Sequence, residues 1–548
     1  MSHEGEVLVH RTLGIHPDPP LTYPSLTPQM AAFFEQVPFL PLGYVDPEGK
    51  LWVSILTGDS EKEQFVHAVS DNLIGVEPRN LSPEDPLIET LKGDHPVPMA
   101  SVGVMVSNRR RNKLYCSSVG AKVDANDGTV RFLVNATGVL GNCPKYITTK
   151  KTWPVQCTPV LSDSFTRLDS KCRQLISRAD QFYMASIHDK DMDVNHRGGR
   201  PGFVRVSEDG SQLIYPEYSG NRLYQTLGNL SVDSRVGIAV PLFESGQVVS
   251  LTGRVTLLYG KDAKAVMPRA NIVVKVDIEK VNLFEDCLGI RASVLEQSPY
   301  PPPVYYLASE SEHRDDKDIK TSAFGDSVEK ITAKISEIVL DVPGSVTWTP
   351  GQYVVLDFRR EMDMGYKHMD DTEPQSLNDD FVRTFTIASK DELKLVTRTV
   401  GSITQFMRMM PGFQVDITAV GGDFIIPKAD TVYVAGGIGI TPLLAQAPTP
   451  NVHLLWSIKE SDLPLVKRYA SSIKPKSATL FITDKKDPHN PADPIDPFTI
   501  HYRRISKQDL QGYDCEWMCC APEGLQTLVA DWVNQLYQKP VKYESFSY

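Results

Sequence analysis

Short apolar runs separated by Gly, Asp and Asn dominate the first 298 residues of the chain. Residues 39–45, 182–187 and 236–240 are examples, and their length and flanking turn residues predict β-strands. The main stretch with a helical pattern is residues 164–181. Many short strands with few long helices are typical of small antiparallel barrels.

The strand pattern occurs twice. An apolar run that ends in Asp spans residues 39–46, and a similar run spans residues 182–189. Each is followed by two further runs rich in Val and Gly, at 102–106 and 118–123 in the first case and at 236–240 and 251–255 in the second. Shared β-propensity alone would explain a loose likeness, whereas the matched order and spacing favour a duplication. We expect two barrels, at residues 1–160 and 161–298.

A different pattern begins after residue 298. Residues 299–322 open with Pro-Tyr-Pro-Pro-Pro and become polar and charged, which predicts a stiff, solvated linker. β-type runs over residues 323–428 predict a further β-barrel. Strands and helical segments alternate over residues 429–548, which predicts a parallel nucleotide-binding sheet. The expected fold class is multidomain, β and α/β.

Charge and cysteine usage narrow the function classes. The net charge is −11, and no block of Lys and Arg is long enough to follow a phosphate backbone, so neither nucleic acid nor a membrane surface is an expected partner. The chain has no run of about 18 apolar residues, so we expect no membrane span, and its N-terminus lacks the pattern of a signal peptide. The eight cysteines show neither iron–sulfur nor zinc spacing, so no metal is expected. A cytoplasmic location is the expectation.

Two glycine-bearing stretches, residues 195–204 and 215–229, carry the first candidate site. Arginines beside glycine-rich backbone suit a phosphate dianion, because guanidinium groups donate charge-assisted hydrogen bonds to it. The segments HRGGRPGF at 196–203 and GNRLYQTLGN at 220–229 resemble those of the pyridoxamine 5'-phosphate oxidase-like FMN-binding split-barrel family, and the resemblance covers about residues 3–285.

That resemblance implies tandem split β-barrels that bind FMN. Such barrels usually hold flavin between two subunits, and a tandem copy would supply both sides from one chain. The residues implied in FMN binding are His196, Arg197, Gly198, Gly199, Gly202, Phe203, Asn221, Arg222 and Asn229. Taken singly, each is equally well explained as a turn or a solvated helix residue. Lys145 and Tyr146 either approach the flavin or end a strand.

Five short motifs follow one another in the C-terminal part. They are Gly351-Gln-Tyr, Arg383-Thr-Phe-Thr, Gly401-Ser, Gly436-Gly-Ile-Gly-Ile-Thr and Cys519-Cys-Ala-Pro. This set resembles the ferredoxin–NADP reductase superfamily over about residues 325–548, which implies a flavin-binding β-barrel, with FAD the usual flavin, and an α/β domain for NAD(P)H. A single glycine-rich turn would be weak evidence.

The resemblance assigns roles to individual residues. Arg383 would neutralise flavin phosphate, Thr386 would reach flavin N5, and Phe385, which replaces the usual Tyr, would pack on the ring. The other residues implied in cofactor binding are Gly401, Ser402, Gly436, Gly437, Gly439 and Thr441, the last four beneath the NAD(P)H pyrophosphate. The implied catalytic residues are Thr386, Cys520, Glu544 and Phe546. The plainer alternative is a buried strand-end thiol and a packed terminal aromatic ring.

Three hypotheses of function follow. In the first, electrons pass from NAD(P)H through FAD to FMN and on to a small organic substrate or oxygen, since flavins carry hydride chemistry that side chains do not. In the second, the reductase serves a separate electron-acceptor protein and the barrels store flavin or dock the partner. The third is a flavin- or haem-binding sensor, which would not need a nicotinamide site. The sequence leaves open a homodimer, the choice between NADH and NADPH, and the segment 360–380, which has no recognisable motif.

Overall fold

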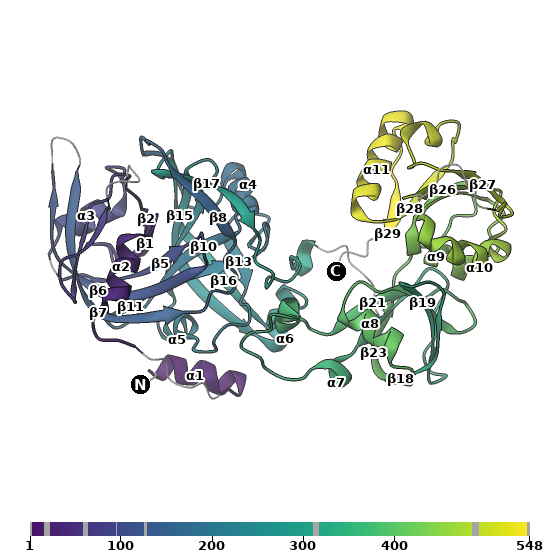
Figure 1. Cartoon of the computed structure of the whole chain (residues 1–548), viewed down its shortest axis with the longest axis horizontal. Helices are drawn as coiled ribbons and strands as arrows, with labels where there is room; N and C mark the ends of the chain where they lie inside the picture. Colours follow the sequence, from purple (N-terminus) through teal and green to yellow (C-terminus); the bar gives the residue numbers. More distant parts are fainter. Residues whose placement is uncertain are drawn as a thin grey trace. The chain divides into compact units, whose positions relative to one another are not determined.

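The computed structural model places most of the chain in two compact units. It describes residues 3–15, 22–58, 64–94, 96–124, 129–310, 317–484 and 493–544. The first unit comprises residues 1–311 together with 366–379, and the second comprises residues 312–365 and 380–548. Figure 1 shows the helices and strands of both units. None of the described helices combines the length and the apolar character needed to cross a bilayer.

The first unit is mostly β-structure. Its elements up to residue 165 are α1 (Glu4–Leu13), α2 (Pro28–Glu35), β1 (Leu40–Val45), β2 (Leu51–Leu56), β3 (Val66–Ala68), β4 (Leu73–Val76), α3 (Pro86–Lys92), β5 (Pro98–Met105), β6 (Arg110–Val123), β7 (Val130–Asn142), β8 (Thr149–Pro154) and β9 (Val160–Phe165). Then follow α4 (Ser170–Arg178), β10 (Gln181–His188), β11 (Asp191–Gly198), β12 (Arg205–Val206), β13 (Gln212–Pro216), α5 (Gln225–Val232), β14 (Arg235–Leu242), β15 (Gln247–Tyr259), α6 (Gly260–Val266), β16 (Ile272–Glu285) and β17 (Ile290–Glu296).

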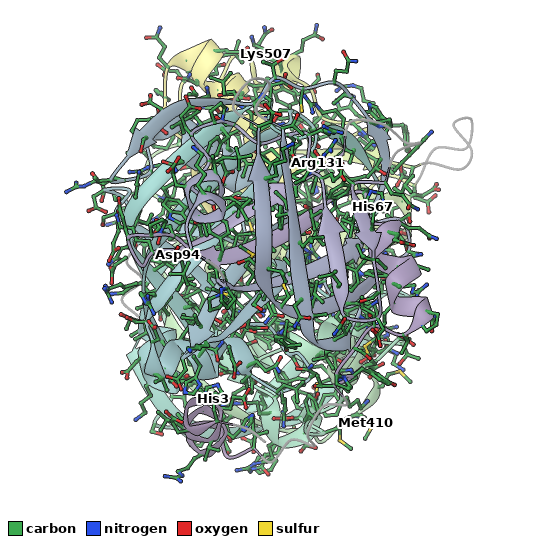
Figure 2. The ribbon with its side chains drawn as sticks, turned by 90° about the vertical axis from the view of Figure 1, so that its left-hand side faces the viewer. His3, His67, Asp94, Arg131, Met410 and Lys507 are labelled. Atoms are coloured by element: carbon green, nitrogen blue, oxygen red, sulfur yellow. The ribbon has the colours of Figure 1, made fainter. Side chains whose placement is uncertain are left out.

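The two large sheets of this unit have the same topology. The first has the strand order β2-β1-β5-β6-β7-β4-β3, and the second has the order β11-β10-β14-β15-β16-β13-β12. Each of these seven strands of the second sheet is therefore the ninth after its counterpart in the first, and β9 adds an eighth strand that pairs with β16. The helices agree as well, because α2 and α4 precede the first strands, while α3 and α5 precede β5 and β14. This agreement supports the duplication. Figure 2 shows the first sheet, with His67 of β3 and Arg131 of β7 labelled.

Alternating side chains give the unit separate cores. On β10, Phe182 and Met184 pack into the core of the second sheet, whereas Tyr183 and Ala185 enter a core that both sheets share. This is the period-two alternation of a strand with two buried faces. Glycine allows the close approach at the shared core, since a Cβ on Gly43 would lie 2.5 Å from Val194 Cγ2.

The second unit combines a barrel with a parallel sheet. The barrel elements are β18 (Lys317–Lys330), β19 (Ile335–Asp341), β20 (Tyr353–Asp357), α7 (Arg359–Met362), β21 (Val382–Thr386), β22 (Leu393–Arg398), α8 (Ser402–Met409) and β23 (Gln414–Gly421). The parallel-sheet elements are β24 (Thr431–Gly436), α9 (Thr441–Gln446), β25 (Val452–Lys459), α10 (Leu463–Ile473), β26 (Ser477–Thr483), β27 (Phe498–His501), β28 (Glu516–Cys520), α11 (Glu523–Tyr537) and β29 (Lys542–Glu544).

The antiparallel strands of the barrel run in the order β21-β20-β23-β18-β19-β22, and a bridge between Ile387 and Leu395 joins the two ends. The parallel sheet has the order β27-β26-β25-β24-β28-β29. Helices α9 and α10 share a core with one face of it, and α11 shares a core with the other. The order reverses direction at β24, because β25 to β27 lie on one side of it and β28 and β29 on the other. Such a reversal is where open α/β sheets bind ligands, at the carboxyl ends of the strands.

The structure departs from the linker expected over residues 299–322 at both ends of that segment. Tyr300, Tyr305 and Leu307 are buried in the first unit, because their aromatic and apolar surfaces outweigh the tendency of the proline run to stay solvated. At the other end, β18 already begins at Lys317. The segment 360–380, which has no recognisable motif, is divided between the units. Its residues 366–379 belong to the first unit, although the chain on either side of them belongs to the second.

Candidate functional site

A pocket in the first unit is lined by residues from both repeats. The pocket is concave and partly open to solvent. Strands β6 and β7 and the chain after them line one side, and β11 and residues 216–226 line the other. Its position between the two repeats is the one that a tandem copy of a two-subunit site would give.

Positive charge is concentrated in this pocket. Five cationic side chains line it, namely Arg111, Lys113, Lys145, Arg197 and Arg222. Among the described residues of its lining, the one carboxylate is Glu217, which accepts a hydrogen bond of 2.9 Å from Arg197 Nε. Burial raises the pKa of Glu217, while the charge of Arg197 opposes that shift. The excess of cations suits an anionic group such as a phosphate monoester.

His196 lies in this lining as a buried, neutral side chain. Its ring contacts Gln181 Oε1 at 3.1 Å through Nε2 and Arg111 Nη1 at 3.5 Å through Nδ1. Burial lowers the pKa of His196 well below its ordinary value, and the neighbouring charges of Arg111 and Arg197 lower it further. Burial likewise lowers the pKa of Arg111 to about 10, so this guanidinium stays charged at pH 7. His196 therefore contributes position and hydrogen bonding to the site, and the arginines contribute charge.

A buried polar cluster lies at the Lys113 side of the pocket. Lys113 forms an ion pair with Asp193, and its Nζ donates to Gln225 Oε1 at 2.9 Å. Asp193 also accepts hydrogen bonds from Asn195 Nδ2 at 2.7 Å and Thr226 Oγ1 at 3.0 Å. Because the side chains of Lys113 and Asp193 are only 3% and 4% exposed, each charge depends on the other for solvation.

Six of the nine residues implied in FMN binding line the pocket: His196, Arg197, Gly198, Phe203, Asn221 and Arg222. The other three have structural surroundings. Gly199 packs so closely on Phe203 that a Cβ would lie 2.3 Å from the ring. Gly202 has a φ of +88° and its carbonyl accepts from Arg205 at 3.0 Å. Asn229 is buried and binds His3 Nε2 at 2.9 Å, which ties α1 to α5.

The sequence did not indicate Lys113 as a site residue, and it did not decide whether Lys145 approaches the flavin or ends a strand. Lys113 is two residues beyond Arg111 on β6, so the two side chains lie on the same face of the strand. A basic pair at alternate positions of a predicted strand is the signal that was available. Lys145 is 1% exposed, and its Nζ donates to the carbonyl oxygens of Ser219 at 2.9 Å and His368 at 2.6 Å. Burial lowers the pKa of Lys145.

In the second unit, the predicted flavin residues lie on β21 and at the start of α8. Thr386 is buried at the end of β21, and Arg383 is half-buried and donates to the carbonyl of Val382 at 2.9 Å. Phe385 is 6% exposed and packs among the core side chains of the barrel. Its ring therefore contributes to the barrel core, whereas packing on a flavin would require an exposed face. Gly401 and Ser402 lie at the N-terminus of α8.

The glycine turn follows β24 at the point where the strand order reverses. Gly437 has a φ of +57°, a conformation that favours glycine, and its carbonyl accepts from Trp456 Nε1 at 2.9 Å. A Cβ on Gly439 would lie 1.9 Å from the carbonyl oxygen of Cys520, and a Cβ on Gly436 would lie 2.7 Å from Pro522 Cδ. These two glycines thus let the turn pack against the end of β28. Thr441 begins α9.

Two further predicted catalytic residues, Cys520 and Glu544, lie at the same end of the sheet. Cys520 ends β28 with its thiol fully buried, and burial raises the pKa of this thiol well above its ordinary value. This burial agrees with the plainer alternative of a packed strand-end thiol. Glu544 ends β29, and its carbonyl accepts from Gln526 Nε2 at 2.6 Å. Phe546 lies outside the described residues. Arg398, which the sequence did not indicate, brings Nη2 to 3.5 Å from the position of a Cβ on Gly437.

Comparisons with known proteins give matches among solved structures. No family model and no curated protein sequence matches the chain. One similar structure is the FAD/NAD-binding domain of nitric oxide dioxygenase from Vibrio cholerae O1 biovar El Tor, with 15% identity, coverage of 42% of this chain and 98% of that one, and a TM-score of 0.31. A ferredoxin NADP⁺ reductase from Neisseria gonorrhoeae has 14% identity, coverage of 42% and 99%, and a TM-score of 0.31. The cytochrome P450 reductase of Amycolatopsis has 17% identity, coverage of 48% and 78%, and a TM-score of 0.33.

Proposed function

We propose that this chain is an NAD(P)H-dependent flavoprotein oxidoreductase. The first unit binds FMN in the pocket between its two repeats, and the second unit binds FAD and NAD(P)H. Bound flavins supply the hydride and electron chemistry, which runs from NAD(P)H through FAD to FMN and on to a small organic substrate or oxygen. The observation that carries the proposal is the set of cations that lines a pocket between the two repeats. Asp193 and Glu217 balance Lys113 and Arg197, which leaves Arg111, Lys145 and Arg222 as the excess positive charge.

Different residues of the pocket would bind different parts of FMN. Arg111, Lys145 and Arg222 supply charge for the phosphate, and Arg197 adds hydrogen-bond donors whose charge Glu217 balances. The Lys113 and Gln225 side offers polar atoms in a largely buried setting, as the polar edge of a flavin ring requires. This division predicts that the phosphate contributes a large part of the affinity.

The proposal for the second unit relies on topology. The glycine turn and Cys520 end adjacent strands where the order of the parallel sheet reverses, which is the usual place for a dinucleotide. Backbone amides at such a turn bind a pyrophosphate because they carry partial positive charge. Thr386 and Arg383, on the barrel strand β21, are the residues we assign to the flavin.

A count of released flavins tests the proposal directly. Purified full-length protein should release one FMN and one FAD per chain on heat denaturation, quantified by chromatography of the supernatant. The assignment of the pocket is wrong if the folded protein does not bind FMN at micromolar concentration and does not prefer FMN over riboflavin.

Arg222→Ala should weaken FMN binding. A lost hydrogen bond to a charged group costs about 1.5–3 kcal/mol, which is roughly tenfold to 150-fold in the dissociation constant. Arg197→Ala should weaken binding as well, and in addition leaves Glu217 without its partner. The measurement is fluorescence titration with FMN and, in parallel, with riboflavin. The matched control is Arg254→Ala, because Arg254 is exposed and pairs with Glu279 away from the pocket. If FMN affinity is unchanged in both pocket variants, Arg197 and Arg222 have a structural role and do not bind the phosphate.

A further inference from the structure

Residues 366–379, which we call the strap, form the segment of the chain that the sequence could not explain. The strap lies in the connection between barrel strands β20 and β21, yet it packs as part of the first unit. Its polar contacts concentrate on the residues that surround the cationic pocket. Loops that a rigid scaffold holds in place often carry residues that support a binding site.

The first contact is with Arg222. The Arg222 guanidinium carbon lies 3.5 Å from the centre of the Tyr366 ring, and Tyr366 Oη donates to the carbonyl of Gly220 at 2.8 Å. A ring stacked on a guanidinium fixes its plane but leaves the N–H groups at its edge available to an acceptor. The stack thus orients Arg222 without consuming its donors.

The second contact is with Lys145, whose Nζ donates to the carbonyl of His368. At the other end of the strap, Asn378 accepts from the amide of Ser219 at 2.9 Å and donates to Tyr146 Oη at 2.9 Å. These bonds hold the pocket residues Lys145 and Tyr146 and the adjoining loop together. Two cations that come from different repeats are therefore fixed by one segment.

We propose that the strap is a positioning element that makes the pocket selective for the phosphate monoester of a flavin. Tyr366 is its main positioning residue, because it sets the plane of Arg222, and the His368 carbonyl sets the direction of Lys145. This inference rests on the proposed function of the pocket. The strap acts through these cations, so its removal should cost affinity for the phosphorylated ligand and leave affinity for the ligand without phosphate.

The test uses full-length protein stripped of flavin and titrated with FMN and with riboflavin. Tyr366→Ala should raise the FMN dissociation constant about fivefold, the range of a partly exposed cation–π contact, and should change the riboflavin value by less than about twofold. Tyr366→Phe keeps the ring and should restore FMN binding. Tyr306→Ala is the matched control, because the Tyr306 ring also lies against an arginine, Arg205 at 4.8 Å, outside the pocket.

The outcomes separate this inference from the proposed function. If the parent protein binds FMN no better than riboflavin, the phosphate site itself is wrong. If the parent prefers FMN and Tyr366→Ala keeps that preference, the positioning role is wrong. If Tyr366→Ala lowers the affinity for FMN and for riboflavin equally, the strap only covers the pocket. If the variant binds FMN more tightly, the strap inhibits binding. Both results overturn the proposal. Tyr366→Leu, which keeps apolar cover, carries the same test should the alanine variant fail to fold.

Discussion

Lys113→Met should lower the free energy of unfolding of the first unit by about 3–5 kcal/mol, the cost of removing one partner from a buried ion pair. The reason is that Asp193, 4% exposed, would lose the cation that offsets its burial. Asn195 and Thr226 would still donate hydrogen bonds to Asp193, but they carry no positive charge. Urea unfolding followed by circular dichroism measures the effect.

The same substitution at Lys50 provides the control. Lys50 pairs with Glu48 at 2.8 Å, but the two side chains are 34% and 73% exposed, so the pair is solvated. Lys50→Met should therefore change stability by less than about 1 kcal/mol. Adding Asp193→Asn to Lys113→Met should recover part of the loss, because the uncompensated charge disappears. Equal losses in the Lys113 and Lys50 variants would contradict the account of the buried pair.

Gly437→Val should reduce the rate at which NADH or NADPH bleaches the flavins by about 100-fold, which corresponds to losing one or two hydrogen bonds to a charged pyrophosphate. Gly437 has a φ of +57°, and a β-branched side chain there is strained and occupies the space that the phosphates need. Stopped-flow absorbance measures the bleaching. Dithionite should still reduce every flavin in the variant.

Gly512→Val is the matched control for this strain. Gly512 has a φ of +90°, and nothing lies within 4 Å of a Cβ built on it, so the substitution carries backbone strain without touching the turn. If NADH or NADPH bleaches the flavins of Gly437→Val as fast as those of the parent, the nucleotide binds elsewhere. If only one flavin of the parent ever accepts electrons from NAD(P)H, the relay is wrong and a diaphorase that serves a separate acceptor protein becomes the better description.

Local pattern predicted the strands of this protein well. The runs at 39–46 and 182–189 became β1 and β10, which occupy equivalent places in two sheets of one topology. Alternating burial and flanking turns are properties of neighbouring residues, so a sequence displays them directly. The parallel sheet of the C-terminal part was also expected, because strands that alternate with helical segments indicate one. The reversal of its strand order at β24 was not predicted.

The rest depended on contacts between distant residues. Lys113 reads as an ordinary strand residue until Asp193 is placed beside it, and Lys145 becomes interpretable only when His368, 223 residues later, lies within hydrogen-bond distance. The prolines near residue 300 suggested a solvated linker, whereas the segment is held by the buried rings of Tyr300 and Tyr305. For Phe385 the sequence predicts packing on a flavin ring, and its place in the barrel core is a second reason for an aromatic residue at that position.

The insertion of the strap has a consequence for how the protein is made. A ribosome completes residue 311 well before residue 379, which lies 68 positions further along the chain (379 minus 311). At roughly 5–20 residues per second, that interval is about 3–14 s. During this time the nascent first unit has its two sheets but lacks the segment that holds Arg222 and Lys145. Flavin capture during translation should therefore be weak until barrel strand β20 and the strap have emerged.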